Sequence, residues 1–132
     1  MQKNRPPEKI KYRPKNLNLF TIKLPINAVV SILHRVSGIG LFLSLPLILW
    51  GLQSLVHSES SYQLLTSWLN TWFVKIMLIG LAWAFFHHFF AGIRHLLQDI
   101  HWMTSLNNAR FSSRIVLWLV GVTTIIFAIV IW

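Results

Sequence analysis

The 132-residue sequence contains no cysteine and only three acidic residues. Without thiols, the chain cannot form disulfides, Cys-ligated zinc sites, iron–sulfur clusters or covalently attached c-type haem. Any redox group that it holds must therefore be ligated by nitrogen, oxygen or methionine sulfur. Charged residues make up 11% of the chain, whereas 55% of its residues are hydrophobic. A soluble domain of this size needs far more polar surface, so the composition predicts a small membrane protein with several spans.

The hydrophobic residues gather in three long runs, which predict an all-α fold with transmembrane helices at about 28–56, 67–99 and 112–132. Each run is long enough to cross a hydrocarbon core of roughly 30 Å at about 1.5 Å per residue. Residues 1–27 form a basic arm punctuated by prolines, which we expect to lie extended at the membrane surface or against a soluble partner. The segment 57–67 is polar and lacks Lys and Arg, and we expect a short loop there.

The formal net charge of +9 is explained by membrane topology and does not require a nucleic-acid partner. Seven of the twelve lysines and arginines precede the transmembrane domain, which we place at residues 28–132. Cytoplasmic flanks of membrane helices collect basic residues, so we expect the N-terminus in the cytoplasm, near anionic lipid. The first apolar run is too long for a signal peptide and lacks a small-residue cleavage site. No transit-like leader precedes it, which favours a bacterial inner membrane over a mitochondrial one.

A column of polar residues lies inside the second hydrophobic run. His88, Gly92, His95 and Asp99 are spaced at i, i+4, i+7 and i+11, so on a helix they share one face. Polar groups at membrane depth are expensive and by default mark a functional site. His88 lies roughly 15 Å from the inner end of the helix, near the middle of the bilayer. The column suits a flat cofactor, with His88 as the axial ligand of a b-type haem and Gly92 leaving room for a ring edge.

The neighbouring polar residues leave several roles open. His87 points to an adjacent face and is the competing ligand, while an interhelical hydrogen bond is the purely structural role for His88. Arg94 and His95 approach the inner surface and could surround haem propionates. Asp99 is either an interfacial charge at the helix end or a group that delivers protons. A six-coordinate haem needs a second axial ligand, which we expect from another chain because three helices are few to enclose a porphyrin.

A second polar face occurs on the first predicted helix. Ser31, His34, Arg35 and Gly38 are spaced there at i, i+3, i+4 and i+7. Arg35 lies about 10 Å inside the membrane, and its guanidinium needs an anion or a dipole because it cannot be neutralised. It either extends to inner-leaflet phosphate or, with the Ser31 hydroxyl, binds a quinone carbonyl. His34 and Arg35 could equally hold haem propionates.

Three blocks of the sequence resemble the cytochrome b subunits of succinate dehydrogenase, the larger membrane anchors of respiratory complex II. They are RPKNLNLF at 13–20, SILHRVSGIGLF at 31–42 and HFFAGIRHLLQD at 88–99. The motifs S-x-x-H-R-x-[ST]-G and H-x-x-x-G-x-R-H-x-x-x-D are specific in combination. With the three spans, the resemblance covers nearly the whole chain.

The resemblance implies an assignment of the site, residue by residue. His88 matches the axial ligand of haem b, with the opposite histidine supplied by the smaller anchor subunit. Ser31 and Arg35 match residues of the ubiquinone site, and His34 and Arg35 match residues near the haem propionates. The family also implies three partners, which are a flavoprotein with FAD that oxidises succinate, an iron–sulfur protein and the small anchor. We expect no activity from this chain alone.

Two other functions remain open. An anchor of a quinol:fumarate reductase is the nearest alternative, although the single haem column and the chain length favour the succinate enzyme. A non-redox membrane scaffold or transporter subunit with an intramembrane His/Arg pair belongs to a different class. In a reduced-minus-oxidised spectrum, a b-type band that is lost on changing His88 supports the cytochrome, whereas an intact assembly without a band favours a non-haem anchor or a scaffold.

Overall fold

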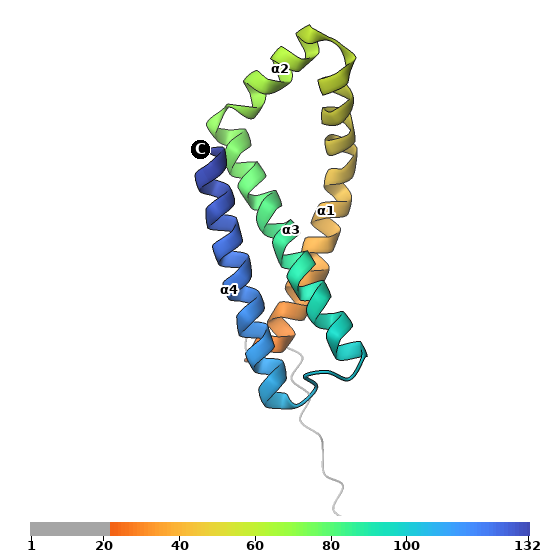
Figure 1. Cartoon of the computed structure of the whole chain (residues 1–132), viewed down its shortest axis with the longest axis vertical. Helices are drawn as coiled ribbons and strands as arrows, with labels where there is room; N and C mark the ends of the chain where they lie inside the picture. The colour runs from red at the N-terminus through yellow and green to blue at the C-terminus, as the bar shows by residue number, and fades with distance from the viewer. Residues whose placement is uncertain (1–21) are drawn as a thin grey trace, which may run out of the picture.

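The computed structural model describes residues 22–132, which form four helices (Figure 1). The helices are α1 (Ile26–His57), α2 (Glu59–Leu69), α3 (Trp72–Asp99) and α4 (Leu106–Ile131). Of these, α1, α3 and α4 are each long and apolar enough to cross a membrane. The predicted all-α fold with three transmembrane helices is therefore confirmed. Most of the predicted arm at residues 1–27 lies outside the described residues.

The segment predicted as a polar loop is instead largely the helix α2, so that prediction is wrong. Ser58 begins this helix as its N-cap, because its Oγ accepts a hydrogen bond from the backbone N–H of Ser61 at 3.2 Å. Glu59 then places a negative charge in the first turn, where the helix dipole is positive. Serine is common both in loops and at N-caps, so composition alone does not distinguish the two.

The predicted second transmembrane helix starts later than residue 67, because the chain turns between α2 and α3. The backbone N–H of Asn70 donates to the Thr66 carbonyl oxygen at 3.1 Å, which closes α2. Thr71 is extended, with φ −74° and ψ 140°, and precedes the first residue of α3. The two helices therefore meet at an angle instead of forming one continuous element (Figure 1).

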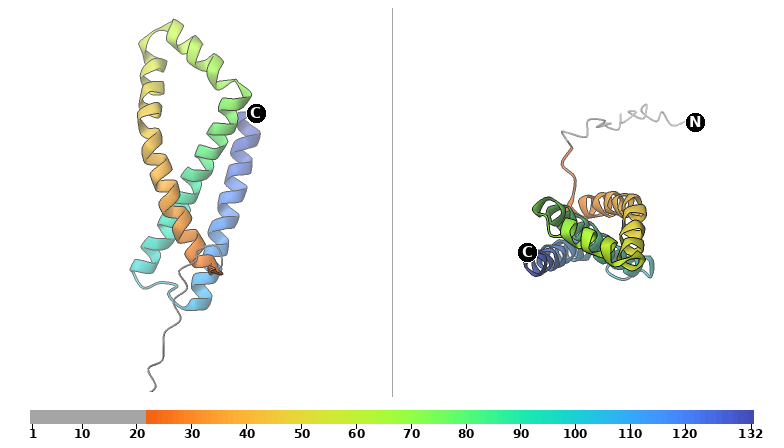
Figure 2. Two further views of the ribbon diagram at one scale, coloured as in Figure 1. Left: turned by 180° about the vertical axis from the view of Figure 1, so that it is seen from behind. Right: turned by 90° about the horizontal axis from the view of Figure 1, so that it is seen from above.

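The helix α3 is central, since it packs against α4 along its length and also crosses α1 (Figures 1 and 2). We call the end where α1 begins and α3 finishes the basal end, which is at the bottom of Figure 1, and the end that carries α2 the distal end. α1 and α3 cross nearer the basal end and diverge toward the distal end, where α2 connects them. The two polar columns predicted from the sequence lie on the helices that cross.

The buried core is small and joins all three long helices. It consists of Val30 on α1, Ala91 on α3, and Val116 and Val120 on α4, with Phe90 packed against them. A small residue such as Ala91 lets helix backbones approach closely, as is typical of membrane bundles. Most other large apolar side chains are exposed, which fits a surface that meets lipid or partner helices in place of water.

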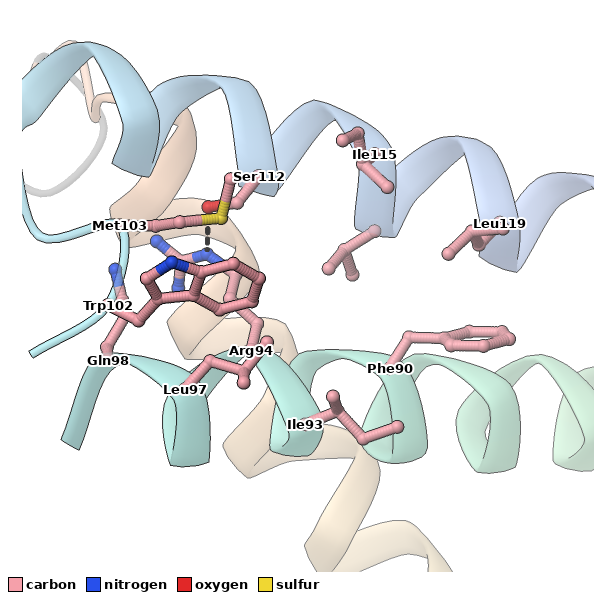
Figure 3. Close-up of a pocket in the computed structure, with 11 residues that line it drawn as sticks. Phe90, Ile93, Arg94, Leu97, Gln98, Trp102, Met103, Ser112, Ile115 and Leu119 are labelled. Carbon is pink, nitrogen blue, oxygen red and sulfur yellow. Dashed lines mark hydrogen bonds between the residues drawn. The ribbon is translucent and has the colours of Figure 1, made fainter. Parts of the chain in front are cut away.

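Polar contacts tie α3 to α4 at both ends. At the basal end, Nε of Arg94 donates to Ser112 Oγ at 3.1 Å (Figure 3). Its Nη2 donates to the Ala109 carbonyl oxygen at 3.3 Å. At the distal end, Nζ of Lys75 donates to the Trp132 carbonyl oxygen at 3.2 Å. Because the two ties are far apart along the bundle, they set the register of α4 on α3.

Candidate functional site

Two histidines meet where α1 crosses α3. The rings of His34 and His88 are stacked, with centroids 4.3 Å apart and an angle of 6° between their planes. Nδ1 of His88 also lies 3.1 Å from the carbonyl oxygen of His34. A carbonyl oxygen can only accept, so Nδ1 is the donor. In the neutral imidazole, Nε2 is then the unprotonated nitrogen, which is the form that binds a metal.

Two glycines, one on each helix, allow this close approach. A Cβ at Gly38 would lie 2.8 Å from Cε1 of His88, which is closer than real Cβ contacts come. A Cβ at Gly92 would lie 3.4 Å from Nε2 of His34. Each imidazole therefore packs over a glycine of the opposite helix. Gly92 makes room for His34 from α1, whereas the spacing predicted that it makes room for a cofactor ring.

Ser37 is a residue of this site that the spacing along one helix face did not indicate, although it occupies the [ST] position of the motif. Its side chain is buried, and its Oγ donates to the His34 carbonyl oxygen at 2.9 Å. That oxygen therefore accepts from both Ser37 and His88, and its position controls the orientation of the His88 ring. The available signal was the place of Ser37 directly before Gly38, within the same motif.

His87, the competing candidate ligand, is fully enclosed by the chain, with 0% of its surface exposed. Its Nε2 lies 3.3 Å from the Val30 carbonyl oxygen and donates to it. Its ring stacks on Trp83, with centroids 5.4 Å apart and 26° between the planes. Because its ring is enclosed and Nε2 is engaged, His87 is poorly suited to bind a cofactor, and the half-buried His88 is better placed.

The other predicted site residues extend from the crossing to the basal end. The ring of His95 lies 5.1 Å from that of His34, so the imidazoles of the two columns form one cluster. On α1, Ser31 is half-buried and Arg35 is exposed. Asp99 is exposed as the last residue of α3, one turn beyond His95. The structure thus brings His34, His88 and His95 together, whereas the side chains of Arg35 and Asp99 are exposed.

Arg94 points away from the histidine cluster, so the expectation that it surrounds haem propionates with His95 is wrong. Its side chain is 6% exposed and binds α4 through Ser112 and Ala109. Arg94 and Trp102 both line a cavity of about 170 Å³ between α3 and α4, and Figure 3 shows the residues around it. Arg94 therefore serves the packing of α4.

The chemistry available at the crossing consists of imidazole nitrogens and hydrogen-bond donors. Within residues 22–132, no group of three or more His, Cys, Asp or Glu side chains could hold a bare metal ion. A structural zinc ion needs four protein ligands, whereas a haem iron can be bound by a single histidine of this chain. The side chains at the crossing therefore fit haem but not a structural zinc ion. Fold and site together define a multi-pass helical membrane protein with a half-buried imidazole where two of its long apolar helices cross.

Comparisons with known proteins identify the family. Residues 9–127 match the family model for the succinate dehydrogenase/fumarate reductase transmembrane subunit. The chain belongs to this family, as its motifs predicted, and is therefore a membrane subunit of an oxidoreductase complex.

Several similar proteins are named succinate dehydrogenase cytochrome b556 subunit. That of Coxiella burnetii is 34% identical over 121 residues, which cover 91% of this chain and 97% of the relative. That of Rickettsia felis is 31% identical over 120 residues, covering 91% of this chain and 90% of the relative. That of Paracoccus denitrificans is 32% identical over 102 residues, covering 77% of this chain and 78% of the relative.

Proposed function

We propose that this chain is the membrane anchor and cytochrome b subunit of a succinate dehydrogenase (succinate:ubiquinone oxidoreductase), with His88 as an axial ligand of one haem b. The observation that carries the proposal is the hydrogen bond from His88 Nδ1 to the His34 carbonyl oxygen. It leaves Nε2 as the nitrogen available to iron. The names of the relatives from three bacteria support the same function.

The residues around His88 fit a haem in their chemistry. Bound here, haem b would supply a one-electron carrier within the membrane. The His34 carbonyl oxygen fixes the tautomer and the ring orientation of His88 and makes it a more basic ligand. Arg35 and His95 are the groups that would pair with the propionate carboxylates. The second axial ligand would come from the small anchor subunit.

Ser31 and Arg35 would contribute to the ubiquinone site. They lie one turn apart on α1, so the hydroxyl and the guanidinium lie on the same face of the helix. Both are hydrogen-bond donors, and donors aimed at a quinone oxygen stabilise the negative charge that develops there during reduction. Reduction to quinol also takes up protons, which Asp99 at the basal end would deliver from the cytoplasmic side.

The chain would act only within a complex. Its exposed apolar surface on three long helices needs lipid and the helices of a small anchor subunit around it. The flavoprotein with FAD and the iron–sulfur subunit would dock at the basal end, which the basic N-terminal residues would hold in the cytoplasm. This arrangement corresponds to the inner membrane of a bacterium, and no activity is expected from this chain alone.

A reduced-minus-oxidised spectrum of the purified complex tests the proposal. In His88→Ala, the b-type band should weaken strongly or disappear, while the partner subunits still copurify. The control His101→Ala removes an exposed imidazole that lies beyond the end of α3 and should leave the band unchanged. A wild-type complex without a b-type band, or recovery of the chain as a pure homo-oligomer, would overturn the proposal.

An anchor of a quinol:fumarate reductase is the second candidate, because the family description covers both enzymes. Rates of succinate oxidation by ubiquinone and of fumarate reduction by menaquinol, measured in the same membranes, separate the two. An intact assembly without haem would instead favour a non-haem anchor or the non-redox scaffold or transporter subunit.

A further inference from the structure

The buried histidine His87 takes no part in the haem or quinone chemistry described above. It precedes His88 in the chain and lies inside the α1–α3 crossing with none of its surface exposed. Its ring stacks on Trp83, and its Nε2 donates to the Val30 carbonyl oxygen. Its other ring nitrogen, Nδ1, is buried without a hydrogen-bond partner among residues 22–132.

The unpaired Nδ1 indicates that apolar packing alone does not explain a histidine at position 87. Burying an acceptor without a partner costs folding free energy, which a methionine or a phenylalanine would avoid. Either of these residues would lose the hydrogen bond to Val30. The distinctive contribution of His87 is therefore that bond.

The hydrogen bonds of His87 and His88 act as a pair between the same two helices. Their acceptors, the carbonyl oxygens of Val30 and His34, are one turn apart on α1, about 6 Å along the helix axis. Two bonds separated in this way fix both the height and the rotation of α1 against α3.

His88 has little room to accommodate a shift of α1. Its Cε1 lies so near Gly38 that no Cβ fits there, and its ring is stacked on His34. A displacement of α1 would therefore turn the His88 ring or lengthen its bond to the His34 carbonyl oxygen. Ligand orientation and the hydrogen bond on the second ring nitrogen both tune the redox potential of a bound iron.

We propose that His87 is a positioning residue, whose hydrogen bond to Val30 sets the height of α1 against α3 and thereby orients the imidazole of His88. This inference rests on the proposed function, in which His88 binds haem iron. His87 acts through α1 and touches neither the cofactor nor the quinone.

Two variants of His87, made in the whole complex, test this role. His87→Gln keeps an N–H group that can reach Val30, whereas His87→Met keeps a similar volume without a donor. In the methionine variant we expect haem to be retained with a shifted midpoint potential and a shifted α band. Because Ser31 and Arg35 move with α1, the KM for a short-chain ubiquinone should rise several-fold, with a smaller change in kcat. The glutamine variant should return these values toward those of the wild type.

A merely structural role would lower the yield of complex but leave the potential and the spectrum of the assembled fraction unchanged, and that result would overturn the proposal. His87→Phe is the second donor-free variant. If it and His87→Met both fail to assemble while His87→Gln assembles, the bond serves folding alone and the proposal is likewise overturned. His88→Ala in the same series separates the failure of this proposal from the failure of haem binding by His88. If the b-type band persists in His88→Ala, His88 is not the haem ligand, whatever the His87 variants show.

Discussion

The Cβ that Gly38 lacks would lie 2.8 Å from Cε1 of His88. The His88 ring can therefore reach the His34 carbonyl oxygen only because position 38 carries no side chain. The reciprocal contact between Gly92 and the His34 ring is looser, at 3.4 Å for an added Cβ. The two glycines of the crossing thus differ in how much space a side chain would have, and alanine substitutions at the two positions should have different effects.

Replacing Gly38 by alanine should remove most of the haem from the purified complex, because the new methyl group pushes His88 away from α1. Gly40→Ala is the matched control, since a Cβ there meets nothing within 4 Å. An alanine in the middle of a helix is itself favourable by roughly 0.5–1 kcal/mol relative to glycine. The ratio of haem to protein should therefore fall only in Gly38→Ala, and equal ratios in both variants would contradict the packing described above.

Gly92→Ala should retain haem, because its Cβ would make a contact with His34 that borders on ordinary van der Waals distance. Gly92→Leu should disturb the His34 ring and lower the haem content, since the larger side chain has no room there. The spectrum and the haem content of both variants check this. If Gly92 instead lay against the cofactor ring, as the spacing predicted, alanine alone would already displace the haem.

Arg94→Gln should destabilise the complex by about 1–3 kcal/mol, because two hydrogen bonds from a charged donor to α4 are lost. The haem spectrum of the intact fraction should not change, since Arg94 points away from the histidine cluster. Arg110→Gln, at an exposed position of α4, is the control. Thermal inactivation of the detergent-solubilised complex measures the effect. An altered spectrum with normal stability would instead place Arg94 beside the haem.

Asp99→Asn should slow quinone reduction and change its pH profile, while the haem spectrum stays the same. The carboxylate is exposed at the basal end, where protons would enter, and asparagine cannot transfer them. Glu59→Gln removes an acid at the distal end and is the control for a general effect of charge. Unchanged activity and pH profile in Asp99→Asn would exclude proton delivery by this residue.

Helical periodicity predicted that histidines of two helices lie on polar faces, but not how they contact one another. The spacing of His88 and His95 on one helix, and of His34 on another, predicted two polar faces, and these faces do meet. Their contact depends on how closely the helices approach at Gly38 and Gly92, which a single helix does not reveal.

Two expectations failed because the partner of a residue is decided by tertiary packing. Arg94 and His95 are neighbours in sequence, yet a turn of about 100° per residue sends them to different helices. The segment that begins at Ser58 has the composition of a loop, but its cap and its attachment to two long helices make it helical. The sequence placed His87 on a different helix face from His88, but its bond to Val30 and its stacking on Trp83 depend on packing that the sequence does not show.

The helix α2 has a consequence for the whole bundle. Its 11 residues, at about 1.5 Å each, form a stiff strut of roughly 16 Å between the far ends of α1 and α3. Deleting one turn from it would draw those ends together, whereas changing its surface residues would not. The distance between the distal ends of α1 and α3, and so the space for any helix that packs between them, is therefore set by the length of α2. None of the candidate ligands lies on this helix.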